Sequence, residues 1–441
     1  MLAVLAPALG YAIAPGNAGN QQAYPSPLAP GGPGVIEPPF AWSLTTGVAY
    51  SDNINRSPDA QSEEVATADL TILAHEERPR LYLDVTGDIQ YREYLQHTYG
   101  STPVGAAAGV LRYTFLPGVF SWMASDNYGQ VAGDAFSVQT PANRESVNVV
   151  QTGPDITIPL NARNQLILQG RGTEVTVQGD ASNSYRQLLG AATLRHRLSR
   201  IFSVGLSYSH SSVDYKQISQ YPNYSVQEYF ADLSVAGPRT TISLDAGYSQ
   251  LKELGLSNGG SLVRLSLTRK VGSRSTIQVQ AGREFSDSAG ILQGEQSFSG
   301  VTLQNAGTTG INDPVRSKFA LASWSTAGVR TTTRVSLTWR KEQHEISTLY
   351  DLTLKSVDLE VGYRLTPRIL IAGSAVYTAN DFRNALVNSK ELDVTGSVTV
   401  RLQQRLSWTT RVGRYSGDGF LGQGQAYHED RLFTGISWKG K

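Results

Sequence analysis

The sequence predicts an all-β protein: a transmembrane, antiparallel, up-and-down β-barrel of about 20 strands, within a range of about 16 to 20. Three observations carry this prediction. Segments of alternating apolar and polar residues recur from about Ala41 to Trp438. Tight turns rich in Pro, Gly and Arg separate them, most at intervals of roughly 35–45 residues, the length of two strands and their connections. Short turns also alternate with longer polar connections, which is typical of outer-membrane barrels.

The segment before the barrel has a different composition. An apolar run, MLAVLAPALGYAIA, opens the chain and ends in small residues. We expect residues 1–18 to be a secretory signal peptide cleaved near Ala14 or Ala18, with a disordered apolar leader as the alternative. The run lacks preceding basic residues, which suggests a start further upstream. Residues 19–40 are a Pro/Gly-rich leader that cannot build a core, so we expect an extended periplasmic segment, followed by the barrel over 41–441.

Several strands have the length and alternation of membrane-spanning strands, about 9–11 residues. In the segment 81–91, Leu83 and Ile89 fall on one face and Asp84 and Asp88 on the other. The segments 277–282, 334–340 and 392–401 alternate in the same way. A soluble sandwich or propeller also alternates, but its strands are usually shorter, about 5–6 residues. The long runs therefore favour the membrane barrel.

Nine tight turns are predicted, and they separate ten hairpins with both ends of the sheet in the periplasm. The turns centre near Pro79, Pro117, Asn161, Ser199, Pro238, Ser273, Gly328, Pro367 and Gln403. The remaining connections are predicted to be long extracellular loops. The longest, at about 288–312, is expected to fold inward as a constriction or to stand outside as a surface tether.

Aromatic residues near the strand ends predict two girdles at the membrane interfaces, although aromatics are also simply good strand formers. One band, toward the loops, comprises Tyr50, Tyr94, Tyr128, Tyr208, Tyr248, Tyr377 and Tyr415. The other, toward the turns, comprises Trp42, Phe120, Phe202, Tyr363, Trp408 and Trp438.

Composition excludes several classes of function. Mean hydropathy is −0.24 and no run of about 18 apolar residues occurs, which argues against a helical membrane protein. A net charge of +1 without a basic stripe argues against a nucleic-acid partner. The chain has no cysteine, and its six histidines do not form a zinc motif. We therefore expect no enzyme, no cofactor and no metal site, with a protease or lipase assembled from loop residues as the alternative.

The polar face of the strands is expected to line a water-filled pore. The candidate pore-lining residues are Asp84, Asp88, Arg92, Arg334, Arg340, Asp358, Glu360, Asp393, Arg401 and Arg411. Glu228, Asp232, Asp245 and Arg264 belong to the same face. Both signs of charge occur, which suits a neutral or weakly charged polar solute rather than an ion-selective channel. For each residue, simple solvation of the lumen is the alternative role.

The segment GVAYSDNINRSP (residues 47–58), placed after a Pro-rich leader and before a long series of hairpins, resembles the outer-membrane β-barrel porins of exopolysaccharide and PEP-CTERM gene neighbourhoods. Tyr50, Ser51, Asp52, Asn53 and Ile54 carry the resemblance. The barrel pattern itself predicts an integral protein of the bacterial outer membrane, inserted into lipid by the barrel-assembly machinery. The resemblance implies a conduit for the export or assembly of an exopolysaccharide. Its partners would be a periplasmic polysaccharide-export protein and a polar saccharide substrate. A general or substrate-specific uptake porin and a structural protein with a plugged lumen are the alternatives.

Overall fold

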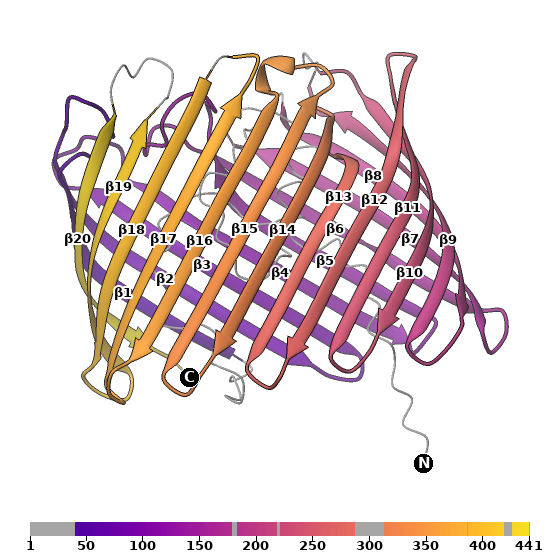
Figure 1. The fold of residues 1–441 in the computed structure, drawn as a ribbon, viewed down its shortest axis with the longest axis horizontal. Helices are drawn as coiled ribbons and strands as arrows, with labels where there is room; N and C mark the ends of the chain where they lie inside the picture. Colours follow the sequence, from indigo (N-terminus) through magenta and orange to yellow (C-terminus); the bar gives the residue numbers. More distant parts are fainter. Residues whose placement is uncertain are drawn as a thin grey trace.

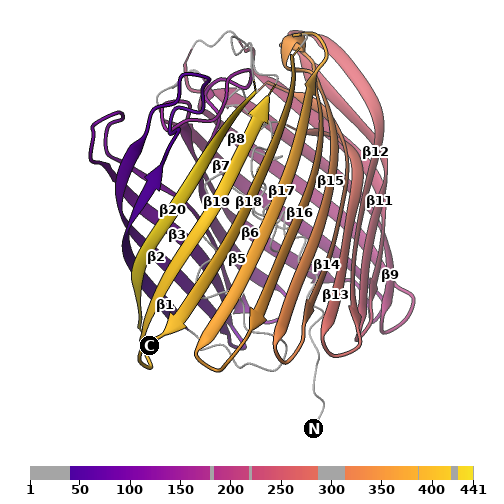
Figure 2. The ribbon, with the colours of Figure 1, turned by 60° about the vertical axis from the view of Figure 1, so that its left-hand side comes forward.

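The computed structural model describes residues 40–178, 183–217, 221–286, 313–385, 387–418 and 426–440. Over these residues, twenty strands form one antiparallel sheet in which each strand pairs with its neighbours in the chain (Figures 1 and 2). Strand β1 also pairs with β20, from Ser43 opposite Lys439 to Ser51 opposite Arg431, so the sheet closes on itself. The predicted all-β, up-and-down barrel is confirmed.

The strands are regular and long, and a short 3₁₀ turn, η2, lies between β15 and β16. Their bounds are β1 Phe40–Ser51, β2 Glu63–Glu77, β3 Leu81–Tyr94, β4 Thr102–Leu116, β5 Phe120–Val131, β6 Glu145–Pro159, β7 Asn164–Val177, β8 Tyr185–Arg197, β9 Phe202–Tyr215, β10 Tyr224–Ala236, β11 Thr240–Glu253, β12 Leu256–Val271, β13 Ser275–Ser286, β14 Val315–Ala327, β15 Thr331–His344, η2 Thr348–Tyr350, β16 Leu352–Arg364, β17 Ile369–Phe382, β18 Val387–Arg401, β19 Leu406–Asp418 and β20 Tyr427–Lys439.

The two faces of the wall differ in the way a membrane barrel requires. In β1, Leu44 and Val48 are exposed on the outside, whereas Ser43 and Thr45 are buried on the lumen side. The same alternation leaves apolar side chains outside on most strands, among them Leu206, Leu337, Leu392 and Ile436. A closed sheet has no unpaired edge, and lipid can cover its apolar outer band. The chain is therefore an integral protein of the bacterial outer membrane.

Nine short connections lie at one end of the barrel, here called the turn end, where β1 begins and β20 finishes (Figure 1). Each falls where the sequence predicts a tight turn, from residues 78–80 to residues 402–405. Gly118 and Gly272 have positive φ in two of them, a conformation that favours glycine. The opposite end, here called the loop end, carries most of the longer connections. Among the described residues, no helix has both the length and the apolar character needed to cross a membrane.

The predicted alternation of short turns with long loops is wrong at two places. The connection between β17 and β18 has only four residues, as many as several turn-end connections, and that between β11 and β12 has two. Strands β11 and β12 are joined at the loop end by Leu254 and Gly255 alone, and the ladder runs up to Glu253 opposite Leu256. Both linking residues have positive φ, 48° and 79°, which is the backbone of a two-residue type I′ hairpin. The signal peptide, the leader up to residue 39 and the loop predicted at 288–312 lie outside the described residues.

The predicted girdles are correct for only some members. Tyr50, Tyr208, Tyr248 and Tyr377 are exposed on the outer face toward the loop end, and Trp408 and Trp438 are exposed toward the turn end. Tyr94 and Tyr415 instead point into the lumen, where each is 1% exposed. Their positions share the parity of Arg92 and Arg411, so the alternation that directs those arginines inward directs the tyrosines inward too.

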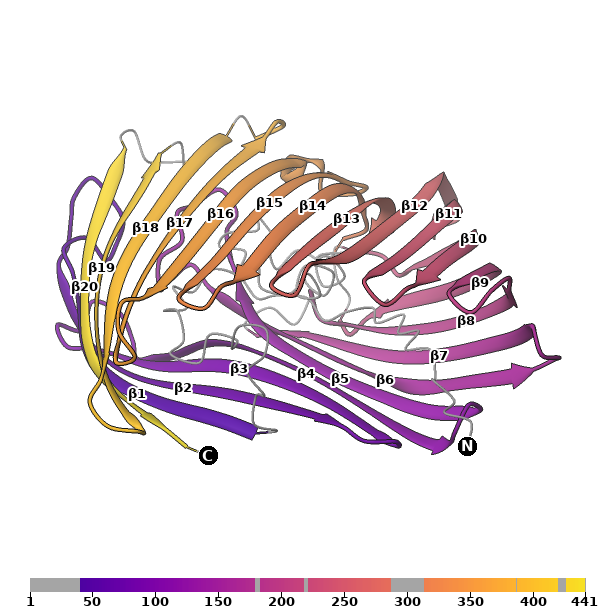
Figure 3. The ribbon, with the colours of Figure 1, turned by 60° about the horizontal axis from the view of Figure 1, so that its bottom comes forward.

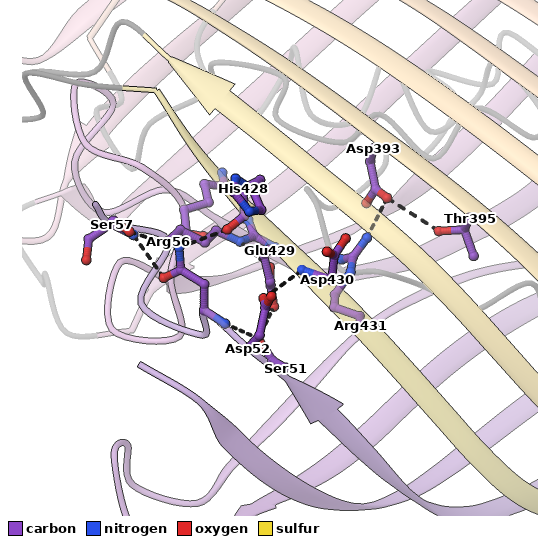
Figure 4. Close-up of polar contacts among 12 residues, drawn as sticks. Ser51, Asp52, Arg56, Ser57, Asp393, Thr395, His428, Glu429, Asp430 and Arg431 are labelled. Atoms are coloured by element: carbon purple, nitrogen blue, oxygen red, sulfur yellow. Dashed lines mark hydrogen bonds and ion pairs between the residues drawn. The ribbon is translucent and has the colours of Figure 1, made fainter. Parts of the chain in front are cut away.

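The segment that carries the family resemblance closes the seam between β1 and β20 (Figure 4). Asn53 Nδ2 donates to the carbonyl oxygens of Ser57, at 2.8 Å, and of His428, at 2.9 Å. The backbone N–H of Asp430 donates to Asp52 Oδ1 at 2.7 Å. These side chains replace ladder bonds where the two strands part, so the Asp and Asn residues stabilise the closure of the barrel.

Candidate functional site

All ten predicted pore-lining residues occupy inward-facing positions of their strands. Most meet another polar group of the wall. Arg334 Nη1 lies 3.1 Å from Glu360 Oε2, and Asp84 Oδ2 lies 3.1 Å from His75 Nδ1 at the turn end. The remaining neighbours are Gln90 for Arg92, Glu342 for Arg340, Arg431 for Asp393, Asp69 for Asp88, Glu360 for Asp358, Lys439 for Arg401 and the ring of Phe433 for Arg411.

One stretch of wall, from β8 to β13, carries a branched charge network. Arg264 on β12 contacts Glu228 at 2.7 Å, Asp245 at 4.0 Å, and Glu284. On the neighbouring strands, Arg195 Nη2 lies 3.8 Å from Asp232 Oδ1. These side chains neutralise one another across the ladder, so the wall presents mixed rather than single-sign charge.

The most distinctive feature of the described interior is the connection between β5 and β6, residues 132–144, here called the crossing loop. It begins after Val131, and its Phe136 packs against Phe382, the last residue of β17, with ring centroids 5.1 Å apart. Five residues of chain reach at most about 17 Å. Around the wall, β17 lies eight strand steps from β5, roughly 38 Å at about 4.8 Å per step. The crossing loop therefore runs through the interior of the barrel rather than along its wall.

The barrel is oblong, and β2–β6 face β13–β18 in Figure 3. The crossing loop extends toward the wall opposite its origin and then returns along other elements. Ala135 and Phe136 pack with Leu352, Leu354 and Val387 of the facing wall. Val138 packs with Tyr415 and Tyr427 of β19 and β20. The side chain of Thr140 is hydrogen-bonded to Tyr99, between β3 and β4. The crossing loop thus narrows the lumen at its loop end.

A single side chain, Asn143, closes the crossing loop on itself. Its Oδ1 accepts the backbone N–H of Asp134 at 2.7 Å. Its Nδ2 donates to the carbonyl oxygens of Asp134, Ser137 and Val138 at 2.9–3.3 Å. Asp134 in turn accepts from the N–H of Phe136 at 3.0 Å and from the hydroxyl of Ser137. These bonds satisfy backbone groups that the strands cannot reach, so the loop has a defined shape.

Arg56, between β1 and β2, ties the crossing loop to the barrel seam. Its Nη1 donates to the carbonyl oxygen of Gln139 at 2.8 Å, and its Nε lies 2.9 Å from Glu429 Oε2. Its guanidinium also lies over the ring of Tyr415, 3.9 Å from the centroid. Burial alone would lower the pKa of Arg56, but the charge of Glu429 and the nearby tyrosines raise it above its ordinary value. The arginine therefore stays charged and holds both partners.

The sequence did not identify this site. The prediction placed a constriction at 288–312, which lies outside the described residues, and left the residues after Val131 without a role. One local signal was present: Phe136 and Val138 are large apolar side chains in a connection otherwise made of Ala, Gly, Pro and polar residues. Arg56 and Glu429 carried no signal of their pairing, because 373 residues separate them. Within the described ranges, no group of His, Cys, Asp or Glu side chains is arranged to hold a metal ion.

Comparison with known proteins gives structural likeness alone. No family model and no curated protein matches the chain. Among solved structures, it is similar to the FrpB iron transporter of Neisseria meningitidis, with 10% identity, a TM-score of 0.43, and 92% of this chain and 82% of that one covered. It is also similar to a variant of the ferric enterobactin receptor of Pseudomonas aeruginosa, with 8% identity, a TM-score of 0.45, and 92% and 81% covered.

Proposed function

We propose that this protein is a passive outer-membrane pore for the uptake of small polar solutes, narrowed by the crossing loop. The observation that carries the proposal is the docking of residues 132–144 against the opposite wall. In this proposal the crossing loop, held in shape by Asn143 and tied to the seam by Arg56, limits the size of the solutes that pass.

The wall chemistry supports a polar solute. Inward positions carry Ser, Thr, Gln and Asn among paired charges of both signs. Such a surface offers many hydrogen-bond donors and acceptors and little net field, which suits small hydrophilic molecules more than simple ions of one sign.

The predicted export of an exopolysaccharide finds no support in the comparisons. A polymer moving through the barrel would require the crossing loop to leave its apolar contacts at Phe136 and Val138. Exposing such side chains costs about 1.5–3 kcal/mol each, a penalty that a small solute avoids. Uptake, stated above as the alternative to export, is therefore the function we propose.

Swelling of proteoliposomes in a series of neutral saccharides tests the proposal. Wild-type protein should admit mono- and disaccharides and exclude longer oligosaccharides. Replacing residues 133–143 by Asn-Gly should admit the longer ones. The matched control is Leu254→Asn in the β11–β12 turn, which lies at the loop end but outside the crossing loop. This variant should leave the size limit for saccharides unchanged. No swelling in any saccharide would refute a pore.

A strain lacking the gene separates uptake from export. Slower growth on a limiting sugar with unchanged exopolysaccharide supports uptake. Loss of exopolysaccharide with normal sugar uptake would replace this proposal by export.

A further inference from the structure

Three hydrogen-bond donors at the root of the crossing loop have no acceptor among the described residues. The hydroxyl of Tyr94 is buried without a partner in this part of the chain, and the residue is 1% exposed. Nε and Nη1 of Arg144 are enclosed in the same way, with no described group accepting from them. Buried donors are nearly always satisfied in folded proteins, and an unsatisfied guanidinium is especially costly. What these donors require is an acceptor.

The fold brings these donors together. Arg144 is the last residue of the crossing loop, immediately before β6, and Tyr94 is the last residue of β3. The ring of Tyr94 packs edge-on against Tyr99, with centroids 5.6 Å apart, and Tyr99 is hydrogen-bonded to Thr140 of the crossing loop. The returning half of the loop therefore lies against the end of β3. The donors belong to two elements fixed relative to each other.

Charged groups of both signs surround Arg144. Burial, followed by the charges of Arg92 and Arg56, lowers its pKa to about 9, whereas Tyr94 and Glu429 oppose that shift. Glu429 is ion-paired with Arg56 and offsets that charge. Arg92 donates to Gln90 at 2.6 Å, and Asp69 and Asp88 lie within its electrostatic reach. Arg144 is left as the cation to which no carboxylate of the described residues is bonded.

We propose that Arg144 and Tyr94, with Arg92 beside them, form a binding site for an oxyanion, the carboxylate or phosphate group of a permeating solute. The guanidinium of Arg144 offers charge-assisted N–H donors to an oxyanion, and the phenol hydroxyl of Tyr94 supplies a neutral donor beside them. The site lies at the root of the crossing loop, so a bound solute would be held at the narrow part of the lumen. This inference rests on the proposed function and adds a substrate class to it.

Isothermal titration calorimetry of the detergent-solubilised full chain tests the site without requiring a pore. The probes are glucuronate and inorganic phosphate, with glucose as the uncharged comparison. Wild-type protein should bind at least one anion and not glucose, and the preferred anion identifies the group that the site takes. Arg144→Gln and Tyr94→Phe should each weaken binding about tenfold or more, the loss expected for a charge-assisted hydrogen bond.

Two controls keep the result interpretable. Arg368→Gln removes one positive charge from an exposed turn and should leave the affinity unchanged. Arg144→Lys keeps the charge but loses the planar set of guanidinium donors, so it should retain only part of the affinity. Heat-modifiable migration on gels checks that each variant is a folded barrel. Absence of binding by both anions, or equal affinity in wild type, Arg144→Gln and Tyr94→Phe, would overturn the site. Swelling in neutral saccharides would still decide the pore separately.

Discussion

Replacing Phe136 by alanine should release the crossing loop from the opposite wall. Phe136 is 8% exposed; its ring stacks on Tyr350 at 5.0 Å and meets Phe382 edge-on at 5.1 Å. Truncation of a packed phenylalanine costs about 3–5 kcal/mol. This cluster lies at the loop end of the barrel, close to solvent, so we take the lower value of about 3 kcal/mol for the cost of the truncation. That cost lowers the ratio of docked to undocked loop roughly 150-fold.

The chain contains no cysteine, so one introduced thiol reports on this equilibrium. Ala135 is 8% exposed in the same cluster, and Ala135→Cys should react with a maleimide only when the loop undocks. If the loop docks and undocks faster than the maleimide reacts, the labelling rate is proportional to the fraction of molecules whose loop is undocked. We expect Phe136→Ala to raise the labelling rate about a hundredfold.

The matched control is Phe115→Ala, because Phe115 is an aromatic on the outer face and 48% exposed. It should leave the labelling rate at Ala135→Cys unchanged. Equal labelling rates with and without the Phe136→Ala substitution would refute the reasoning, since they would show that this side chain does not hold the loop.

Three further predictions concern the same loop. Asn143→Ala removes the bonds that close it and should cost about 1–3 kcal/mol, seen as faster proteolysis within residues 132–144; unchanged cleavage would contradict the role of this clip. Arg56→Ala leaves the carboxylate of Glu429 buried without its partner and should cost about 3–5 kcal/mol, measured as a lower midpoint in denaturant; a midpoint equal to wild type would contradict the ion pair's importance. Anion affinity should fall as pH rises through about 9, because Arg144 loses its proton there and a neutral guanidine no longer attracts an anion; calorimetry at pH 7 and 10 with equal affinities would count against Arg144 as the binding group.

The sequence predicted the wall of this barrel because strand alternation and turn chemistry are local. Pro79, Pro117 and Pro367 mark three turns through their fixed φ, and alternate positions along each strand assign a face. The same local rule could not identify Leu254 and Gly255 as a two-residue turn, because leucine rarely adopts positive φ. There the register of the paired strands imposes the conformation.

The interior was predictable only in part. Alternation directs Arg92 and Arg411 inward, and it directs Tyr94 and Tyr415 inward as well. The tendency of aromatic side chains to form a girdle on the outer face predicted the opposite for these two tyrosines. The path of the crossing loop depends on contacts with a wall more than 200 residues away, as between Phe136 and Phe382. No periodicity records such a contact, so only the folded barrel reveals it.

The current through single channels in a planar bilayer tests the central claim, a water-filled outer-membrane pore narrowed by the crossing loop, most directly. Wild-type protein should give discrete conductance steps, and the variant with residues 133–143 replaced by Asn-Gly should give larger ones. Steps of equal size in both proteins would contradict the constriction. Absence of current in both, with folded protein inserted, would contradict the pore itself.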